Sequence, residues 1–144
     1  MCIRDSYFGR EKALKEKLST FGAIWVSGGN SFVLRQAMRL SGFDNLFPDL
    51  IARKEFIYGG YSAGICILSD TLKPIDLVDD PYNFPYEGIR QPIYEGLGVF
   101  NYCFLPHHDS DHPESKMVDQ EIQRCIKNKW LFKAIKDGEV IIIK

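Results

Sequence analysis

Short apolar runs that alternate with amphipathic helical segments constrain the fold of this chain more than any other feature. Strands are predicted at Ala23 to Val26, Phe56 to Gly60 and Val99 to Leu105, and each ends in polar or glycine-rich residues. Strands that alternate with helices indicate a mostly parallel sheet with helices on both faces. The sequence therefore predicts an α/β fold whose chemistry gathers at the carboxyl ends of the strands.

Helical periodicity fills the segments between these strands. An irregular excursion is predicted over Thr71 to Pro92, and a final strand over Glu139 to Ile143, after the Asp137–Gly138 turn. The predicted helices are Arg10 to Ser19, Phe32 to Leu40, Phe47 to Arg53, Ala63 to Leu68 and Glu114 to Lys127. With no internal repeat or linker, residues 1–144 are interpreted as a single, incomplete domain.

The first residues do not fit the alternating pattern. A doubly wound domain usually opens on a strand, whereas Met1 to Ser6 leads directly into a helix. We expect residues 1–6 to be a non-native leader and the N-terminal strands of the fold to be missing.

Composition and charge narrow the functional classes. The chain carries 18 Lys and Arg against 19 Asp and Glu, a balance that argues against a nucleic-acid-binding surface. No apolar run approaches the roughly 20 residues that span a bilayer, and no signal-peptide core is present, so no membrane partner is expected. The cysteines are widely spaced, as in reduced cytoplasmic proteins. They are Cys2, Cys66, Cys103 and Cys125.

The segment Gly60 to Gly64 fits the G-x-S-x-G pattern of a nucleophile elbow. Its small residues let the strand and helix backbones pass closely, which lifts Ser62 out of the sheet. The backbone N–H of Ala63 is then placed to donate to an oxyanion. The alternative is that Ser62 only caps the following helix, which is a common role of serine.

A serine hydroxyl needs a base, and His107 is the candidate. It follows a predicted strand and Pro106, 45 positions after Ser62. The order Ser…Asp/Glu…His is that of the α/β hydrolases. His108 competes for the role, and a surface-loop histidine without catalytic function is the alternative.

A third residue must orient the imidazole, and the sequence leaves its identity open. We select Asp76 narrowly, with Glu95 next, while Asp79 to Pro81 also fits turn chemistry. The acidic residues considered between serine and histidine are Asp70, Asp76, Asp79, Asp80, Glu87 and Glu95.

Two further segments admit other chemistry. Gly28 and Gly29 could supply a second oxyanion donor or cradle a phosphate, but they match no nucleotide-binding pattern. The loop His107 to His112 contains imidazoles and carboxylates that can bind zinc or manganese. Because these groups crowd into one loop, we expect no metal. Cys66 is interpreted as a packed thiol rather than a nucleophile.

Three motifs together resemble the peptidase E family of serine peptidases, which includes aspartyl dipeptidase and cyanophycinase relatives. They are Val26 to Phe32, Tyr58 to Gly64, and Tyr94 to Gly98 leading to Leu105 to His107. The resemblance implies a class I glutamine-amidotransferase-like, flavodoxin-like three-layer fold with serine replacing that superfamily's usual cysteine. It implies Ser62 as nucleophile, His107 as base, an acid near Asp76, and an oxyanion hole from Gly28, Gly29 and Ala63.

The expected function is therefore serine-type hydrolysis of short peptides without a cofactor, with dipeptides carrying N-terminal Asp as one substrate class. Family members are longer than this chain. In aspartyl dipeptidases an arginine binds the substrate carboxylate, and no arginine lies near Met117 to Val118, where it is expected. Lys116 or Arg124 could replace it. The substrate-binding candidates are Asn30, Tyr61 and Lys116. The alternatives are a non-catalytic small-molecule-binding module and a metal-dependent hydrolase using the His107 to His112 loop. A homodimer is compatible with the sequence.

Overall fold

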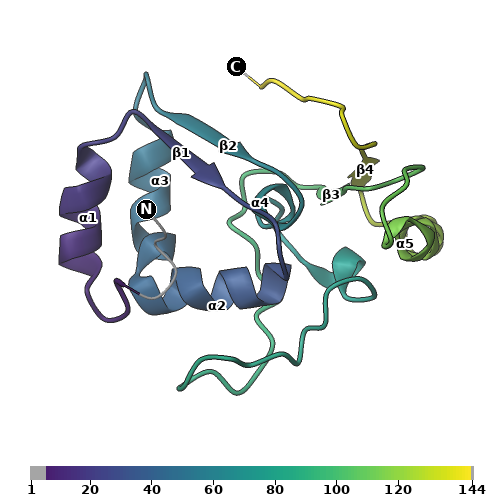
Figure 1. Ribbon diagram of the computed structural model, residues 1–144, viewed down its shortest axis with the longest axis horizontal. Coiled ribbons are helices and arrows are strands. Elements are labelled where there is room, and N and C mark those ends of the chain that lie inside the picture. The colour runs from purple at the N-terminus through teal and green to yellow at the C-terminus, as the bar shows by residue number, and fades with distance from the viewer. Residues whose placement is uncertain (1–5, 144) are drawn as a thin grey trace.

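Two pairs of parallel strands form the framework of the computed structural model, which describes residues 6–143 (Figure 1). Strand β1 (Ala23–Val26) pairs with β2 (Ile57–Gly60), and β3 (Cys103–Leu105) pairs with β4 (Phe132–Ala134). Helices connect the strands within each parallel pair, as parallel connections require. The parallel α/β architecture agrees with the sequence prediction, although the described strands form two separate pairs.

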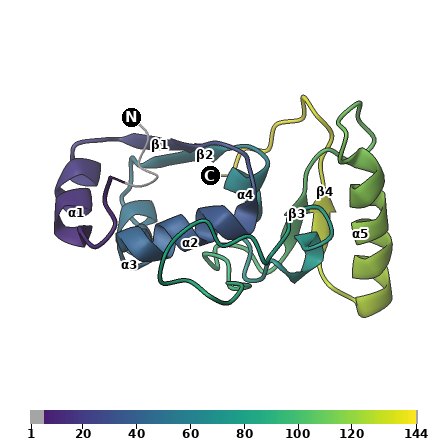
Figure 2. The same cartoon turned by 60° about the horizontal axis from the view of Figure 1, so that its bottom comes forward.

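Each strand pair has its own helices. Figure 2 shows α2 and α3 on the same side of the β1–β2 pair, while α5 packs beside β3 and β4. The described helices do not cover the outward side of β1–β2, where Trp25 is 71% exposed. The helical elements are α1 (Glu11–Ser19), α2 (Ser31–Ser41), α3 (Phe43–Ile51), α4 (Ala63–Cys66), the 3-10 helix η1 (Lys73–Ile75) and α5 (Ser115–Asn128).

The C-terminal strand lies earlier than the sequence predicts. The expected strand over Glu139 to Ile143 is wrong, because these residues have no strand partner and Val140 and Ile142 are largely exposed. The strand that pairs is β4, which precedes the Asp137–Gly138 turn. An apolar run without a neighbouring strand leaves its backbone groups to water and does not form sheet.

Several other expected boundaries also shift. The strand expected from Val99 starts only at Cys103, the helix expected from Phe47 starts at Phe43, and the elbow helix ends at Cys66. The expected non-native leader, residues 1–6, lies outside the described residues except for Ser6. Within residues 6–143, no helix is long and apolar enough to cross a membrane.

Two hydrophobic clusters meet at the short helix α4. The first gathers around α1 and α3 and includes Phe47 and Ile67, while the second lies beneath β3 and α5 and includes Cys66 and Leu105. Neighbouring residues at the end of α4 thus belong to different clusters. Because close packing holds both sides of α4, the turn that precedes it has little freedom to move.

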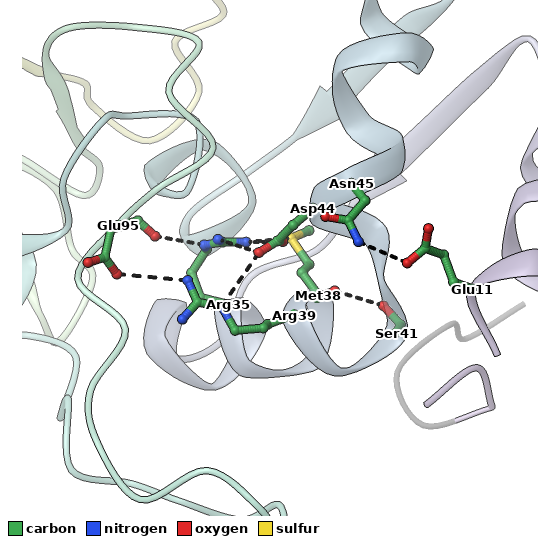
Figure 3. A network of polar contacts seen from close by, with 8 residues as sticks. All are labelled: Glu11, Arg35, Met38, Arg39, Ser41, Asp44, Asn45 and Glu95. Atoms are coloured by element: carbon green, nitrogen blue, oxygen red, sulfur yellow. Dashed lines mark hydrogen bonds and ion pairs between the residues drawn. The ribbon is translucent and has the colours of Figure 1, made fainter. Parts of the chain in front are cut away.

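A buried arginine fixes helix α2 against α3 (Figure 3). Arg35 is 2% exposed and forms a bidentate pair with Asp44, at 2.6 Å and 2.9 Å. Its Nε donates to the backbone carbonyl of Glu95 at 2.9 Å. The planar guanidinium fork suits such a three-way contact, which ties the 95–98 segment to the helices under β1–β2.

Candidate active site

Ser62 occupies a strained turn between β2 and α4. Its backbone angles are φ 49° and ψ −124°, in a region that residues with a Cβ rarely adopt. Although Ser62 holds the N-cap position of α4, its side chain makes no capping hydrogen bond. The capping role is therefore unsupported, and strain at a serine is typical of functional sites.

Close approach of three backbones explains the glycines around Ser62. A Cβ on Gly64 would lie 2.2 Å from the carbonyl oxygen of Val26, so only glycine lets α4 approach β1. A Cβ on Gly28 would lie 3.0 Å from the Ser62 Cβ and 3.3 Å from its Oγ. The turn after β1 is thus in contact with the serine, as the predicted convergence of strand ends requires.

Tyr58 secures the elbow from within β2. Its hydroxyl donates to the carbonyl of Gly64 at 2.5 Å, and burial raises the pKa of this phenol above its usual value. A neutral phenol remains a hydrogen-bond donor at every physiological pH. The bond therefore holds the first turn of α4 against the strand that carries Ser62.

His107 also has a left-handed backbone conformation, with φ 64°, at the end of β3. The hydroxyl of Ser110 donates to the His107 carbonyl at 3.0 Å and accepts from the N–H of His112 at 3.3 Å. The rings of His107 and His112 stack with centroids 3.8 Å apart and planes 15° apart. The loop therefore holds the His107 ring from the backbone and from one face.

Asp137 is the carboxylate that contacts His107. Its Oδ1 lies 2.7 Å from Nδ1 of the imidazole. Burial alone would raise the pKa of Asp137, but its polar contacts, chiefly the hydrogen bond from the His107 side chain, outweigh it and hold the pKa below its usual value. An ionised carboxylate only accepts hydrogen bonds, so the hydrogen belongs on Nδ1 and Nε2 is left as the basic nitrogen.

Strand pairing explains how residues 30 positions apart in sequence meet. Leu105 at the end of β3 is in register with Ala134 at the end of β4, and the strands are parallel. His107 follows β3 by two residues and Asp137 follows β4 by three. Both side chains therefore emerge at the same edge of this strand pair.

One cavity joins the serine and histidine sides. Its volume is about 560 Å³, and both Ser62 and His107 line it together with Asp137. Most of its other walls are apolar, with Trp25, Ile65 and Phe104 among them. A largely apolar hollow with a few convergent polar groups is the usual form of a small-molecule site.

The acids selected from the sequence lie elsewhere. Asp76 pairs with Arg124 at 2.6 Å, and the Glu95 carboxylate lies 3.9 Å from Arg39 (Figure 3). Asp79 accepts the backbone N–H of Ser31 at the start of α2. Burial raises the pKa of Asp79 above its usual value, although hydrogen bonds to Ser31 and the charge of His107 partly offset this.

The other acids considered do not contact the histidine in the described chain. Asp80 accepts the N–H of Tyr82 at 2.9 Å, which is the turn chemistry expected there. In the described part of the chain, Asp70 and Glu87 form no hydrogen bond or ion pair with His107, and neither lines the cavity. Among the described carboxylates, Asp137 is thus the one within hydrogen-bond distance of this imidazole, whereas Asp79 lies near enough to feel the charge of His107 without a hydrogen bond to it.

Of the three residues expected to bind substrate, one lines the cavity and two do not. Tyr61 is half exposed and lines the cavity beside Ser62. The amide of Asn30 accepts from the N–H of Val33 at 2.9 Å and donates to the carbonyl of Asp80 at 3.0 Å, so it caps α2. Lys116 is exposed on α5 and does not line the cavity.

The competing histidine has a different environment. His108 Nδ1 lies 3.2 Å from Asp119, and its backbone N–H donates to Ile135. It does not line the cavity that contains Ser62. Of these adjacent histidines, only His107 shares a cavity with the serine.

Comparison with known proteins identifies the family. A model of peptidase family S51 matches residues 8–144. The chain belongs to peptidase family S51. This membership agrees with the resemblance to peptidase E, and the matched residues include the elbow at Ser62.

The S51 chain is similar to two curated proteins of Listeria. It is 29% identical over 121 residues to the uncharacterized peptidase Lin0382 of Listeria innocua, covering 84% of this chain and 54% of that protein. It is 29% identical over 128 residues to the uncharacterized peptidase Lmo0363 of Listeria monocytogenes, covering 89% and 59%. The chain thus spans a little over half the length of these relatives.

A solved structure supports the fold assignment of this S51 chain. The similar structure is a 1.5 Å crystal structure from Listeria monocytogenes EGD-e, of a protein designated a candidate peptidase E. The TM-score is 0.74 at 24% identity, over 98% of this chain and 67% of that one. The predicted α/β, flavodoxin-like fold class is confirmed at this level.

Sequence reasoning missed the placement of Asp137. It interpreted Asp137–Gly138 as a turn before a strand, and it sought the acid between the serine and the histidine. The available signal was the apolar Leu131–Phe132 pair after helix α5, which marks the position of β4. With that strand placed parallel to β3, Asp137 falls at the same sheet edge as His107.

Proposed function

We propose that this S51 protein is a serine peptidase that hydrolyses short peptides through Ser62, His107 and Asp137. The observation that carries the proposal is the conformation of Ser62, which is strained, flanked by required glycines and free of a capping hydrogen bond. His107 is proposed as the base because it shares the cavity with Ser62, and Asp137 is proposed as the acid because it contacts His107. The order Ser…His…Asp differs from that of the α/β hydrolases, but triads are defined by geometry and role.

The reaction begins with proton transfer from Ser62 Oγ to Nε2 of His107, as Oγ attacks the scissile carbonyl. The developing oxyanion accepts hydrogen bonds from the backbone N–H of Ala63 and from the Gly28–Gly29 turn. Asp137 stabilises the imidazolium, which then donates its proton to the leaving amine. Water, activated by the same imidazole, hydrolyses the acyl-enzyme and restores Ser62.

The cavity fits a short peptide rather than a long one. Its volume of about 560 Å³ lies within the usual range for small-molecule sites. Dipeptides with N-terminal Asp remain one substrate class, and Tyr61 lines the site beside Ser62. The buried free thiols of Cys66, Cys103 and Cys125 support a reducing, cytoplasmic setting.

Hydrolysis of a dipeptide panel by the purified protein, with and without a chelator, tests the proposal. We expect chelator-resistant turnover that falls at least about 10³-fold in Ser62→Ala, since removal of a catalytic nucleophile has effects of this size or larger. Ser19→Ala is the matched control, because this exposed serine at the end of α1 does not line the cavity.

Two results would replace the proposal. Activity that chelators abolish and a divalent ion restores would establish a metal hydrolase. Ligand binding that is equal in wild type and Ser62→Ala, with no hydrolysis by either folded protein, would establish a non-catalytic binding module.

A further inference from the structure

Three potential metal ligands lie together on the loop that carries the histidine base. One donor atom from each of His107, His112 and Glu114 lies within 4.8 Å of the other two. All three side chains are partly accessible, at 13%, 35% and 38% of their surfaces. From this cluster we propose that the protein binds a divalent transition-metal ion, Zn²⁺, and that binding blocks the base. The blocking role rests on the proposed serine peptidase function.

The donor set matches the chemistry of zinc. Two imidazoles and one carboxylate form a recurring three-ligand set for Zn²⁺, with bonds of about 2.0–2.2 Å and a fourth position open. Mg²⁺ and Ca²⁺ prefer sites made entirely of oxygen, so this nitrogen-rich set disfavours them. All three donors come from one eight-residue stretch, so coordination requires no movement between distant elements.

The contacts of the His107 ring indicate which of its atoms faces the ion. Asp137 occupies Nδ1 of His107, which leaves Nε2 for a metal. Such a carboxylate–histidine contact is the usual outer support of a zinc ligand. His112 Nδ1 accepts the backbone N–H of Glu114 at 3.3 Å and lies 3.7 Å from the carboxylate Oε2 of the same residue.

Coordination requires local rearrangement within the loop. Imidazole lone pairs lie in the ring plane, and the rings of His107 and His112 are stacked nearly parallel, 3.8 Å apart. An ion cannot lie in both planes at once, so the His112 ring must turn. In a tetrahedral site the donor atoms lie roughly 3.3–3.5 Å apart, so donor atoms that are now up to 4.8 Å apart must also move closer together.

Metal binding and catalysis would then compete for one atom. Nε2 of His107 is the nitrogen that takes the Ser62 proton in the proposed reaction. An ion on that lone pair prevents proton transfer, so Zn²⁺ acts as a reversible inhibitor. The Ser62 hydroxyl need not be a ligand.

Calorimetric titration with Zn²⁺ tests the site independently of turnover, and inhibition of peptide hydrolysis by Zn²⁺ tests its consequence. Each protein's own metal-free rate is the reference. We expect saturable 1:1 binding, and a matching inhibition constant, that weaken at least about tenfold in both Glu114→Gln and His112→Phe. The phenyl ring of His112→Phe retains a stacking partner for His107. Asp111→Asn, which removes an equal charge from an exposed position of the same loop, should bind Zn²⁺ as wild type does.

The outcomes separate the site from the function. Absence of saturable Zn²⁺ binding, or equal binding by Glu114→Gln, His112→Phe and Asp111→Asn, would overturn the site. Full peptide hydrolysis when Zn²⁺ saturates this site would overturn the blocking role. Site-dependent binding by a protein that hydrolyses no peptide would support the metal site while removing the peptidase proposal. Equal binding of Mg²⁺ would contradict the assignment to a transition metal.

Discussion

The serine side of the cavity, residues 23–66, and the histidine side, residues 103–137, hold their functional groups by different means. Ser62 is fixed by backbones in contact, where Val26, Gly28 and Gly64 leave no room for side chains. His107 is fixed by side chains, through Asp137 at its Nδ1 and the stacked ring of His112. Steric exclusion therefore fixes the serine side, whereas polar and stacking contacts between side chains fix the histidine side.

This difference predicts how each side responds to substitution. Steric clash in a close-packed turn costs free energy of folding, because the backbones must move apart. Loss of the charge of Asp137, whose side chain is 48% exposed, costs little stability and acts on the reaction. Substitutions of the glycines around Ser62 should therefore change folding, and those of the polar partners of His107 should change turnover.

The largest effect is expected at Asp137. Asp137→Asn retains the shape of the side chain but removes the charge that orients and stabilises the imidazole. We expect kcat/KM for peptide hydrolysis to fall by about 10² to 10⁴, as for other triad acids, with little change in the free energy of unfolding. Asp76→Asn is the matched control, and its kcat/KM should remain within about threefold of wild type. A larger loss in Asp76→Asn than in Asp137→Asn would restore the acid selected from the sequence.

The next largest effect is expected at Gly64, on the serine side of the cavity. In Gly64→Ala the new methyl group meets the Val26 carbonyl, so the free energy of unfolding should fall by about 1–3 kcal/mol in urea titrations. Gly22→Ala is the control, because no atom lies within 4 Å of its added Cβ, and it should change stability by less than about 0.5 kcal/mol. Equal stability of the two variants would show that close approach does not hold the elbow.

A buried acid under the histidine side makes stability depend on pH. Glu121 is 1% exposed and accepts the N–H of Val78 at 3.1 Å. Burial raises the pKa of Glu121 from 4.5 to about 8, although backbone hydrogen bonds and the charge of Arg124 partly offset this rise. The folded state therefore binds more protons than the unfolded state between these values, and stability falls as pH rises through them. The titratable or charged groups that face Glu121 are Asp79, Arg124, Cys66, Cys103 and Cys125.

Glu121→Gln removes this titration while keeping a hydrogen-bond acceptor. The free energy of unfolding of the variant, relative to wild type, should increase between pH 5 and pH 8 by up to about 1.4 kcal/mol per pH unit. Urea titrations across this range measure the difference. Parallel pH profiles for the two proteins would show that Glu121 is ionised in the folded state.

The smallest effect concerns Asn30, which the sequence suggested as a substrate ligand. Asn30→Ala removes the cap of α2, so stability should fall by about 1 kcal/mol while KM for peptides stays constant. Asn30→Asp, which retains an acceptor for the Val33 N–H, should recover most of that loss. A several-fold rise in KM at unchanged stability would instead support contact with substrate.

The two sides also differ in how far the sequence could predict them. The elbow depends on contiguous residues, so Gly60 to Gly64 was sufficient to predict the turn between strand and helix that carries Ser62. The carboxylate on His107 depends on the register of β3 with β4, which no local pattern contains. Misplacement of the last strand at Glu139 to Ile143 moved Asp137 away from the predicted sheet edge. Asp76 then remained the preferred acid, although its charge pairs with Arg124.

Covalent labelling by a fluorophosphonate tests most directly whether Ser62, His107 and Asp137 act as one unit, because it requires no knowledge of the substrate. The serine oxygen displaces fluoride from phosphorus while the imidazole takes the proton. We predict one adduct per chain, located on Ser62 by peptide mass mapping. Its rate of formation should fall at least about 10²-fold in His107→Ala and Asp137→Asn but remain unchanged in Asp76→Asn. Labelling at another residue, or labelling of Ser62 at equal rates in all four proteins, would contradict the account.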